Sequence, residues 1–391
     1  MRGHIVKRHT KRFKNNWSIV IELGRDSKTH KRKQQWFSFT GSKIAAEKRL
    51  AEILHQLDAG TFIQPGKTTL GEYLSRWLKD YKQNLSPRGF ERYQSVVKSD
   101  ITPALGNIAM TQLRPEHLQR YYASQLEKDR SPGTVRYSHA VLHVALKEAV
   151  KLGMLSRNVA DAVTPPRIHA KEMQTWDEEE ANRFLDVAKD SGYFELFYLA
   201  LFSGMRRSEL LALRWQDVDL MFGQVHVLRG LHQLRDGSFE FSEPKSAKSR
   251  RNVNLTPSTA IMLREYREKQ ERDRVPFGIK LTNDALVFSH FDGKPLRPNS
   301  VTRAWEMLAA KAGVKVIRLH DARHTHASLM LKQGIHPKVV QERLGHSSIQ
   351  ITLDTYSHVA PGLQEAAAAR FDEGLLPRQK NEVVKKALAS G

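Results

Sequence analysis

The sequence predicts a multidomain protein that is mainly α-helical and carries small antiparallel β-sheets, an α+β arrangement. Its 391 residues are enough for two or three domains, each with a core of its own. Apolar residues recur at helical spacing over most of the chain, whereas alternating stretches are confined to the first forty residues and to about 224–255. Segments rich in Pro and Gly at 60–66 and 164–167 separate these regions.

The first region, residues 1–62, is predicted to be a small β-sheet backed by one helix. Residues 17–23 alternate like a strand, 35–39 form another, and Ser42 caps a helix that runs to about Leu57. The first fifty residues hold fourteen Lys and Arg against three acidic residues. A sheet this basic suits insertion into a DNA groove, and the alternative is a solvated charged surface.

Residues 67–163 are predicted to form a small all-α domain of four helices. Thr69 and Glu72 make a capping box at the start of the first helix. The apolar stripe of that helix has regular helical spacing and consists of Leu70, Tyr73, Leu74, Trp77, Leu78 and Tyr81. The other three helices begin with proline in the first turn, at Pro87, Pro115 and Pro132, and the last ends before Gly153.

Residues 172–375 are predicted to form a third domain, and 376–391 a tail with a short basic amphipathic pattern. Three helices should open the domain, near 177, at 193–202 and at 208–213. Strands are expected at 224–228, 238–241 and 251–255, followed by helices near 257–272, 298–312, 320–333, 336–344 and 350–359.

The net charge of +21 and the pI near 10.0 indicate a polyanionic partner, because each cation placed at a phosphate releases counterions from a nucleic acid. The plainer alternative is a basic housekeeping protein such as a ribosomal protein. The absence of cysteine excludes disulfides, Cys-ligated zinc and thiol nucleophiles. No apolar run is long enough to cross a bilayer and no signal peptide is evident, so we expect a cytoplasmic protein with no membrane partner.

Four motifs in the third region have the residue types that an anion-handling site needs. Residues 203–210 combine a helix end, a glycine turn and a new helix start, which present backbone N–H groups and an arginine to an anion. His320 and Arg323 lie one helical turn apart. His346 ends the following helix, and Tyr356 comes ten residues later. Taken singly, each motif also has an ordinary structural interpretation, such as a surface arginine at a helix cap.

Taken together, the motifs resemble the tyrosine recombinases, the phage integrase family. The resemblance is carried by SGMRRSELLALRW, EPKSAKSRRNVNL, RLHDARHTHAS, LGHSSIQIT and DTYSHV, which match six positions in order and spacing over 172–375. It implies the DNA breaking-rejoining fold for this catalytic domain. Residues 67–163 resemble the family's core-site DNA-binding domain, and 1–62 resemble the arm-site-binding module of mobile-element integrases.

The resemblance gives catalytic roles to Arg206, Lys245, His320, Arg323, His346 and Tyr356. A phosphodiester is anionic, so cations must neutralise the charge that develops as phosphorus is attacked. Arginine suits this task because its planar fork binds two oxygens, and the resemblance gives that role to Arg206 and Arg323. It makes Lys245 the donor of a proton to the leaving 5′ oxygen.

Tyr356 is the implied nucleophile, and its phenol, with a pKa near 10, must lose a proton as it attacks. His320 is implied as the base or proton relay, since imidazole titrates near working pH. His346 would hydrogen-bond the phosphate and steady the tyrosine. Glu209 either orients the arginine of its motif or makes a structural salt bridge.

Some assignments leave an alternative open. Arg207 neighbours Arg206, and Lys248 lies three residues from Lys245. His324 and His326 could form a zinc site with His320, but no carboxylate or Cys pattern accompanies them, so we expect no metal and no cofactor.

The resemblance implies a site-specific recombinase that cleaves and rejoins double-stranded DNA through a 3′-phosphotyrosine intermediate. It would integrate and excise a mobile element or prophage in a bacterial host. The implied partners are core and arm attachment sites and a homotetramer that passes through a Holliday junction, with an excisionase or a host DNA-bending protein as candidate accessory factors. The competing interpretations are a type IB topoisomerase and a DNA-binding regulator that has lost catalysis.

Overall fold

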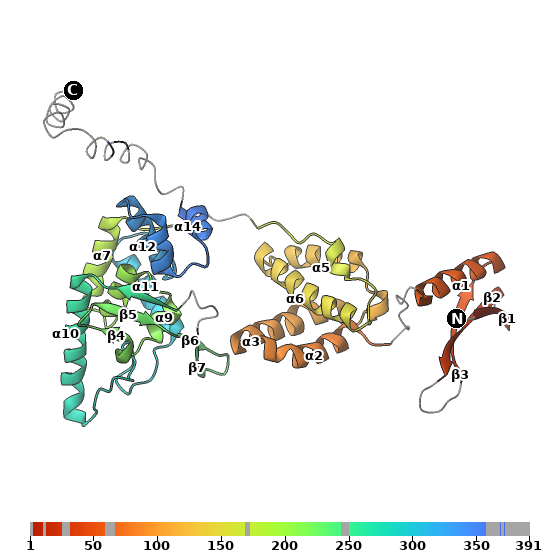
Figure 1. The fold of residues 1–391 in the computed structure, drawn as a ribbon, viewed down its shortest axis with the longest axis horizontal. Helices are drawn as coiled ribbons and strands as arrows, with labels where there is room; N and C mark the ends of the chain where they lie inside the picture. Colours follow the sequence, from red (N-terminus) through yellow and green to blue (C-terminus); the bar gives the residue numbers. More distant parts are fainter. Residues whose placement is uncertain are drawn as a thin grey trace. The chain divides into compact units, whose positions relative to one another are not determined.

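A computed structural model describes residues 3–10, 13–25, 32–58, 67–168, 173–243 and 250–356, together with Ala368 and Phe371. The chain divides into two compact units, Met1–Ala170 and Lys171–Gly391, which are described separately (Figure 1). The predicted mainly helical fold with small antiparallel sheets is confirmed. Within the described ranges, none of the helices combines the length and apolar character that a bilayer crossing requires.

The first unit begins with an antiparallel sheet in the order β1 (Gly3–Thr10), β2 (Phe13–Arg25) and β3 (Arg32–Thr40). Helix α1 (Lys43–Asp58) packs on one face, where Ile53 meets the buried side chains of β2. The two predicted strands and the helix are confirmed. Sequence analysis did not single out β1, because its few apolar residues lie in a basic run.

The rest of this unit is helical and has a separate apolar core. Its helices are α2 (Leu70–Tyr81), α3 (Pro87–Ser95), α4 (Thr102–Leu105), α5 (Pro115–Glu127) and α6 (Pro132–Lys151). The predicted capping box of α2 forms: Thr69 Oγ1 accepts from the Glu72 backbone N–H at 3.3 Å, and Glu72 accepts from the Thr69 N–H at 2.9 Å. The short α4 is an addition to the four predicted helices.

The second unit surrounds a core of stacked aromatic rings, in which the rings of Trp176 and Trp305 lie 4.8 Å apart. Its first three helices are α7 (Glu178–Ala188), α8 (Phe194–Ser203) and α9 (Arg207–Leu211). Five more follow the strands: α10 (Pro257–Arg274), α11 (Pro298–Lys311), α12 (Asp321–Lys332), α13 (Pro337–Leu344) and α14 (Ile349–Tyr356). All eight were predicted, although residues 357–359 of the last lie outside the described residues.

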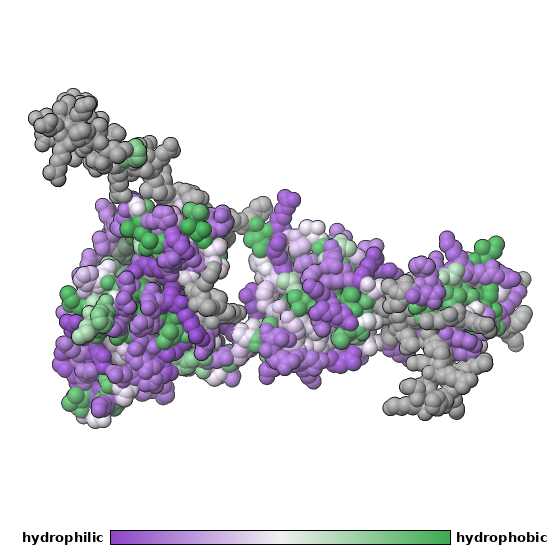
Figure 2. Space-filling model, viewed as in Figure 1, coloured by the Kyte–Doolittle hydropathy of each residue, from purple (hydrophilic) through white to green (hydrophobic). Residues whose placement is uncertain are grey.

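Two small sheets complete the second unit. One has the order β4 (Val218–Asp219), β5 (Gln224–Val227) and β8 (Arg251–Asn254), and the other pairs β6 (Gly230–Gln233) with β7 (Phe239–Ser242). Strands β5, β7 and β8 were predicted, whereas β4 and β6 were not. Figure 2 shows that hydrophilic residues cover most of the visible face and that apolar residues gather only in small groups.

Candidate active site

The site is built around the turn between α8 and α9. Helix α8 ends at Ser203, and Gly204 adopts a left-handed conformation with φ of 65°, which turns the chain so that Arg206 becomes the N-cap of α9. A Cβ at position 204 would lie 2.7 Å from the His326 side chain on α12 and 2.7 Å from Leu344 on α13. Only glycine therefore lets this turn approach both helices.

Replacing Gly204 by alanine is expected to destabilise the protein by about 2–4 kcal/mol, because it adds backbone strain and an overpacked contact. Gly237→Ala is the matched control, since Gly237 also has a positive φ (87°) but no atom within 4 Å of the added Cβ. It isolates the backbone strain, which costs about 1 kcal/mol. Urea unfolding measures the stability of both variants. Equal losses of stability in Gly204→Ala and Gly237→Ala would show that the contacts of position 204 with His326 and Leu344 add no cost.

Arg206 is held by Glu209. The backbone N–H of Arg206 donates to Glu209 Oε2 at 2.8 Å, and its Nη1 donates to Oε1 at 2.6 Å. Burial raises the pKa of Glu209, but hydrogen bonds from Arg251 and the charges of Arg251 and Arg206 outweigh burial and hold the pKa at about 2. The carboxylate is therefore charged at neutral pH and orients Arg206.

Arg207, the alternative to Arg206, points to helix α11 instead of to Glu209. Its Nη1 donates to Thr302 Oγ1 at 2.5 Å and to the carbonyl of Pro298 at 3.3 Å, both on α11. This geometry favours Arg206 as the arginine that faces the cluster.

Arg323 on α12 is the most buried cation of the cluster, with only 3% of its surface exposed. Its Nη1 donates to the carbonyl of Gly204 at 2.9 Å, and its Nη2 donates to that of Leu344 at 2.5 Å. Burial and the charges of Arg206 and Arg251 lower the pKa of Arg323 to about 9. The cations therefore repel one another in the free protein, and an anion bound among them would relieve that repulsion.

His346 follows the left-handed Gly345 at the end of α13. Its Nδ1 is hydrogen-bonded to Thr352 Oγ1 at 2.9 Å, and burial and the charges of Arg323 and Arg206 lower its pKa to about 4. At neutral pH the ring is uncharged and can present Nε2 to an oxygen. His320 lies at the N-cap of α12 with an exposed side chain, and partial desolvation and Arg323 lower its pKa.

Tyr356 is the last residue of α14, and its side chain is 1% exposed. Its hydroxyl lies 2.7 Å from His324 Nδ1, and the His320 ring meets His324 edge-on at 5.2 Å between centroids. Burial raises the pKa of Tyr356 to about 12, while the charge of Arg323 acts in the opposite direction. The phenol is thus protonated and held by His324 rather than by His346.

The contact with His324 was missed in the sequence, where this histidine was considered only as a metal ligand. Its position next to Arg323 gave no signal, because the contact joins residues 32 positions apart. His326 also has a structural role: its Nδ1 is bonded to the Leu201 carbonyl at 2.8 Å, and its Nε2 accepts from Arg343 at 3.0 Å. Lys245 and its alternative Lys248 lie outside the described residues. No group of three or more potential metal ligands occurs in the part of the chain that the structure describes.

His326 on α12 makes the stability of the protein depend on pH. Burial and Arg343 lower the pKa of His326 to about 3, so between about pH 6.5 and 3 the unfolded chain binds a proton that the folded chain excludes. Stability should therefore fall on acidification, by up to about 1.4 kcal/mol per pH unit for His326 alone. The urea midpoints of unfolding at pH 7 and pH 5 measure this loss of stability. The midpoint of His326→Gln should fall less between the two pH values than that of the wild-type protein. An equal slope in the two proteins would contradict the assignment.

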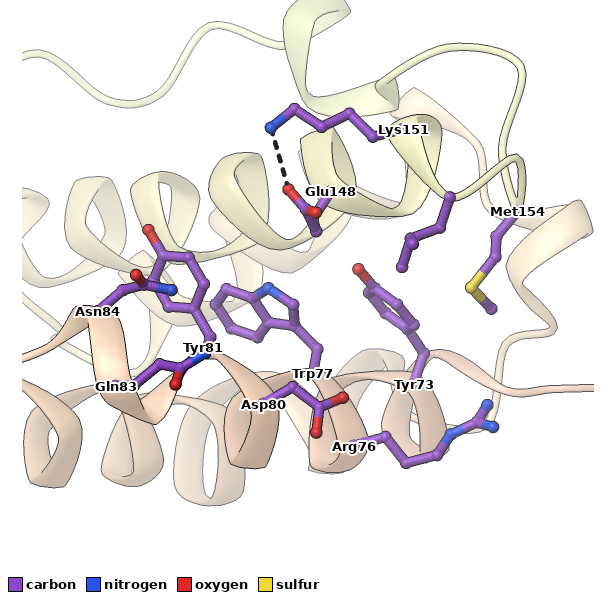
Figure 3. A pocket seen from close by; sticks show the side chains of 11 residues that line it. Tyr73, Arg76, Trp77, Asp80, Tyr81, Gln83, Asn84, Glu148, Lys151 and Met154 are labelled. Atoms are coloured by element: carbon purple, nitrogen blue, oxygen red, sulfur yellow. Dashed lines mark ion pairs between the residues drawn. The ribbon is translucent and has the colours of Figure 1, made fainter.

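A cavity of about 680 Å³ lies in the helical part of the first unit (Figure 3). Tyr73, Trp77 and Tyr81 line it on α2, and the Glu148–Lys151 ion pair lies on the α6 side with N and O 3.2 Å apart. None of the predicted catalytic residues contributes to it. The candidate site therefore remains the cluster at α9, α12, α13 and α14.

Comparison with known proteins gives the family that the chain resembles. Residues 174–362 match the model described as Phage integrase family, and residues 69–125 match Phage integrase, N-terminal SAM-like domain. A Tyrosine recombinase XerC-like protein of Caldanaerobacter subterraneus subsp. tengcongensis is 26% identical over 90% of this chain and 95% of its own length. The ICEBs1 integrase of Bacillus subtilis is 27% identical over 77% of this chain and 82% of its own length.

Two solved structures share the fold. The Tn1549 transposon integrase in complex with a circular intermediate DNA has a TM-score of 0.65 at 19% identity, covering 78% of this chain and 99% of that one. A lambda integrase tetramer bound to a Holliday junction has a TM-score of 0.58 at 16% identity, covering 89% of this chain and 94% of that one.

Fold and site together define an enzyme that breaks and rejoins DNA strands in site-specific recombination. The chain belongs to the phage integrase family of tyrosine recombinases, whose two models together match more than half of its residues.

Proposed function

We propose that this recombinase cleaves DNA through a 3′-phosphotyrosine at Tyr356 and that it integrates and excises a mobile element or prophage. The observation that carries the proposal is that Arg323 hydrogen-bonds two turns, at the Gly204 carbonyl before Arg206 and at the Leu344 carbonyl before His346. The charge of Arg323 also acts on the phenol of Tyr356. Three separate elements supply the anion-binding groups, and a fourth supplies the phenol. Such an arrangement suits phosphoryl transfer.

In the proposed reaction, the Tyr356 oxygen bonds to phosphorus while the bond from phosphorus to the 5′ oxygen breaks. Arg206 and Arg323 neutralise the charge on the non-bridging oxygens, and neutral His346 donates a hydrogen bond. The phenolic proton leaves toward the His324 and His320 pair, of which His324 is within hydrogen-bonding distance. The leaving 5′ oxygen takes a proton from Lys245. Because Tyr356 is buried, its phenol must become accessible to DNA before attack.

The phosphotyrosine ester keeps the free energy of the broken bond, so attack by a 5′ hydroxyl reseals the strand without ATP. Fixed arginines supply the charge neutralisation that a metal ion supplies in other nucleic-acid enzymes. The proposed reaction therefore balances with DNA and protein alone.

Double-stranded DNA is the proposed substrate, bound at core and arm sites by a homotetramer. We propose residues 1–62 as the arm-binding domain, 67–163 as the core-binding domain, 172–375 as the catalytic domain and 376–391 as a separate tail. The first two have separate apolar clusters, and the solved relatives are described as bound to a circular intermediate and to a Holliday junction. Excisionase or a host DNA-bending protein remains a candidate accessory partner. Because the relatives come from bacteria and phages, the proposed place of action is DNA in a bacterial cytoplasm.

The sheet of the first unit supports the arm-binding role. Helix α1 covers one face, while the opposite face carries the exposed side chains of His4, Arg8 and Trp36. A basic and aromatic face on a three-stranded sheet fits a DNA groove.

Two assays test the proposal together. A nicked suicide substrate traps covalent protein–DNA complexes, and a two-site plasmid assay scores recombination. Recombination supports the integrase, relaxation of supercoils without recombination supports a topoisomerase, and DNA binding without either supports a regulator.

A further inference from the structure

Arg251, a residue that the family resemblance did not assign, lies at the centre of the cluster. It is the first residue of β8, its side chain is 5% exposed, and it follows closely on the segment that contains Lys245. Its Nη1 and Nη2 donate to the two oxygens of Glu209 at 3.0 and 2.9 Å. Its Nε donates to the backbone carbonyl of Arg343 at 2.7 Å.

The same side chain packs against the turn that carries His346. Gly345 has φ of 68°, and a Cβ there would lie 2.9 Å from Arg251 Cδ. The carbonyl of Arg343 and the adjoining carbonyl of Leu344, which accepts from Arg323, belong to the same turn. Arg251 therefore joins Glu209 on α9 to the backbone that positions His346 and Arg323.

We propose that Arg251 is a positioning residue, which holds Glu209 and the Gly345 turn so that Arg206 and His346 both face the scissile phosphate. The physical reason is charge balance around one buried carboxylate. With Arg251 in place, Arg206 and Arg251 both pair with Glu209, and Arg206 keeps N–H groups that can donate to a phosphate. Without Arg251, Glu209 has lost one of its two guanidinium partners and draws Arg206 toward itself.

Lysine cannot replace this arrangement in full. A guanidinium presents parallel N–H groups to both carboxylate oxygens and a third donor to the Arg343 carbonyl, whereas an ammonium group on a single flexible stem cannot match that fork. Arg251→Lys should therefore restore charge but only part of the geometry.

The proposal rests on the proposed function, because its readout is covalent trapping on a suicide substrate at saturating DNA. Arg251→Met is expected to lower the trapping rate roughly 100-fold, with DNA affinity changed less than about threefold, because alignment and not binding is lost. Arg251→Lys should recover about tenfold of that loss. The matched control is Arg229→Met, which breaks the pair between Arg229 and the buried Asp217 elsewhere in the same unit. It should trap at the wild-type rate per folded molecule.

A double-mutant cycle separates positioning from general stability. If Arg251 acts partly through Glu209, Arg251→Met should cost clearly less in the Glu209→Gln background than the roughly 100-fold expected in the wild-type protein, because only the bond to the Arg343 carbonyl is left to lose. Multiplicative losses, or trapping by Arg251→Met within about threefold of wild type, would overturn the proposal. If Arg251→Met does not fold, Arg251→Lys replaces it both in the rate comparison with wild type and in the double-mutant cycle. Its trapping rate should be about tenfold below the wild-type rate, and a rate within about threefold of wild type would overturn the proposal. A wild-type protein that traps no DNA would instead count against the proposed function itself.

Discussion

Replacing Tyr356 by phenylalanine should abolish the covalent protein–DNA complex while leaving DNA affinity within about threefold of wild type. The change removes the one oxygen that forms the bond to phosphorus, and the ring still fills the apolar contacts of α14 with Leu331, Val340 and Leu344. Denaturing gels after incubation with a nicked substrate give the covalent yield, and a mobility-shift titration gives the affinity.

Tyr198→Phe is the matched control for this variant. The Tyr198 hydroxyl contacts only the exposed Ser258 Oγ at 3.2 Å among the hydrogen bonds described, so trapping should be unchanged. Covalent product from Tyr356→Phe above the background of heat-denatured protein would contradict the assignment of the nucleophile.

Replacing Arg323 by methionine is expected to slow cleavage about 10³–10⁵-fold, equivalent to about 4–7 kcal/mol of transition-state stabilisation. The loss is large because the guanidinium is buried, and because it also bridges the carbonyls of Gly204 and Leu344. Single-turnover cleavage of a nicked substrate measures the rate, and near-UV circular dichroism reports the folded fraction.

A neighbouring arginine provides the control for the loss of charge. The Arg318 side chain is 78% exposed and pairs with Asp321, so Arg318→Met should cleave within about threefold of wild type. Cleavage by Arg323→Met within tenfold of wild type would show that Arg323 does not stabilise the transition state.

Most helices could be predicted from the sequence because their boundaries carry local signals. Thr69 with Glu72, and proline in the first turn at Pro87, Pro115 and Pro132, each act within one helical turn. Strands β4 and β6 were not predicted, because strands of two and four residues are too short to show an alternation of apolar and polar residues. Their pairing is decided by tertiary packing.

The residue types of the candidate site were predicted from the sequence, whereas their contacts were not. Order and spacing pointed to Arg206, Arg323, His346 and Tyr356, yet no local pattern reveals that Arg251 bonds Glu209 from 42 positions away. The pairing of Tyr356 with His324 likewise depends on how α12 and α14 pack. Long-range contacts of this kind arise from the fold and leave no periodic trace in the sequence.

The domain boundaries were also predicted only in part. Composition predicted three domains and a tail, whereas contacts divide the chain into two units, with the sheet and the helical core both inside Met1–Ala170. The two apolar clusters of that unit support the finer division, which remains a proposal.

Peptide mapping of the covalent complex tests the central claim most directly. Wild-type protein is trapped on a nicked duplex, digested with a protease and a nuclease, and the nucleotide-bearing peptide is sequenced by mass spectrometry. We expect a single modified peptide in which Tyr356 carries a nucleotide through its 3′ phosphate. A nucleotide on any other side chain, or a linkage through a 5′ phosphate, would contradict the account.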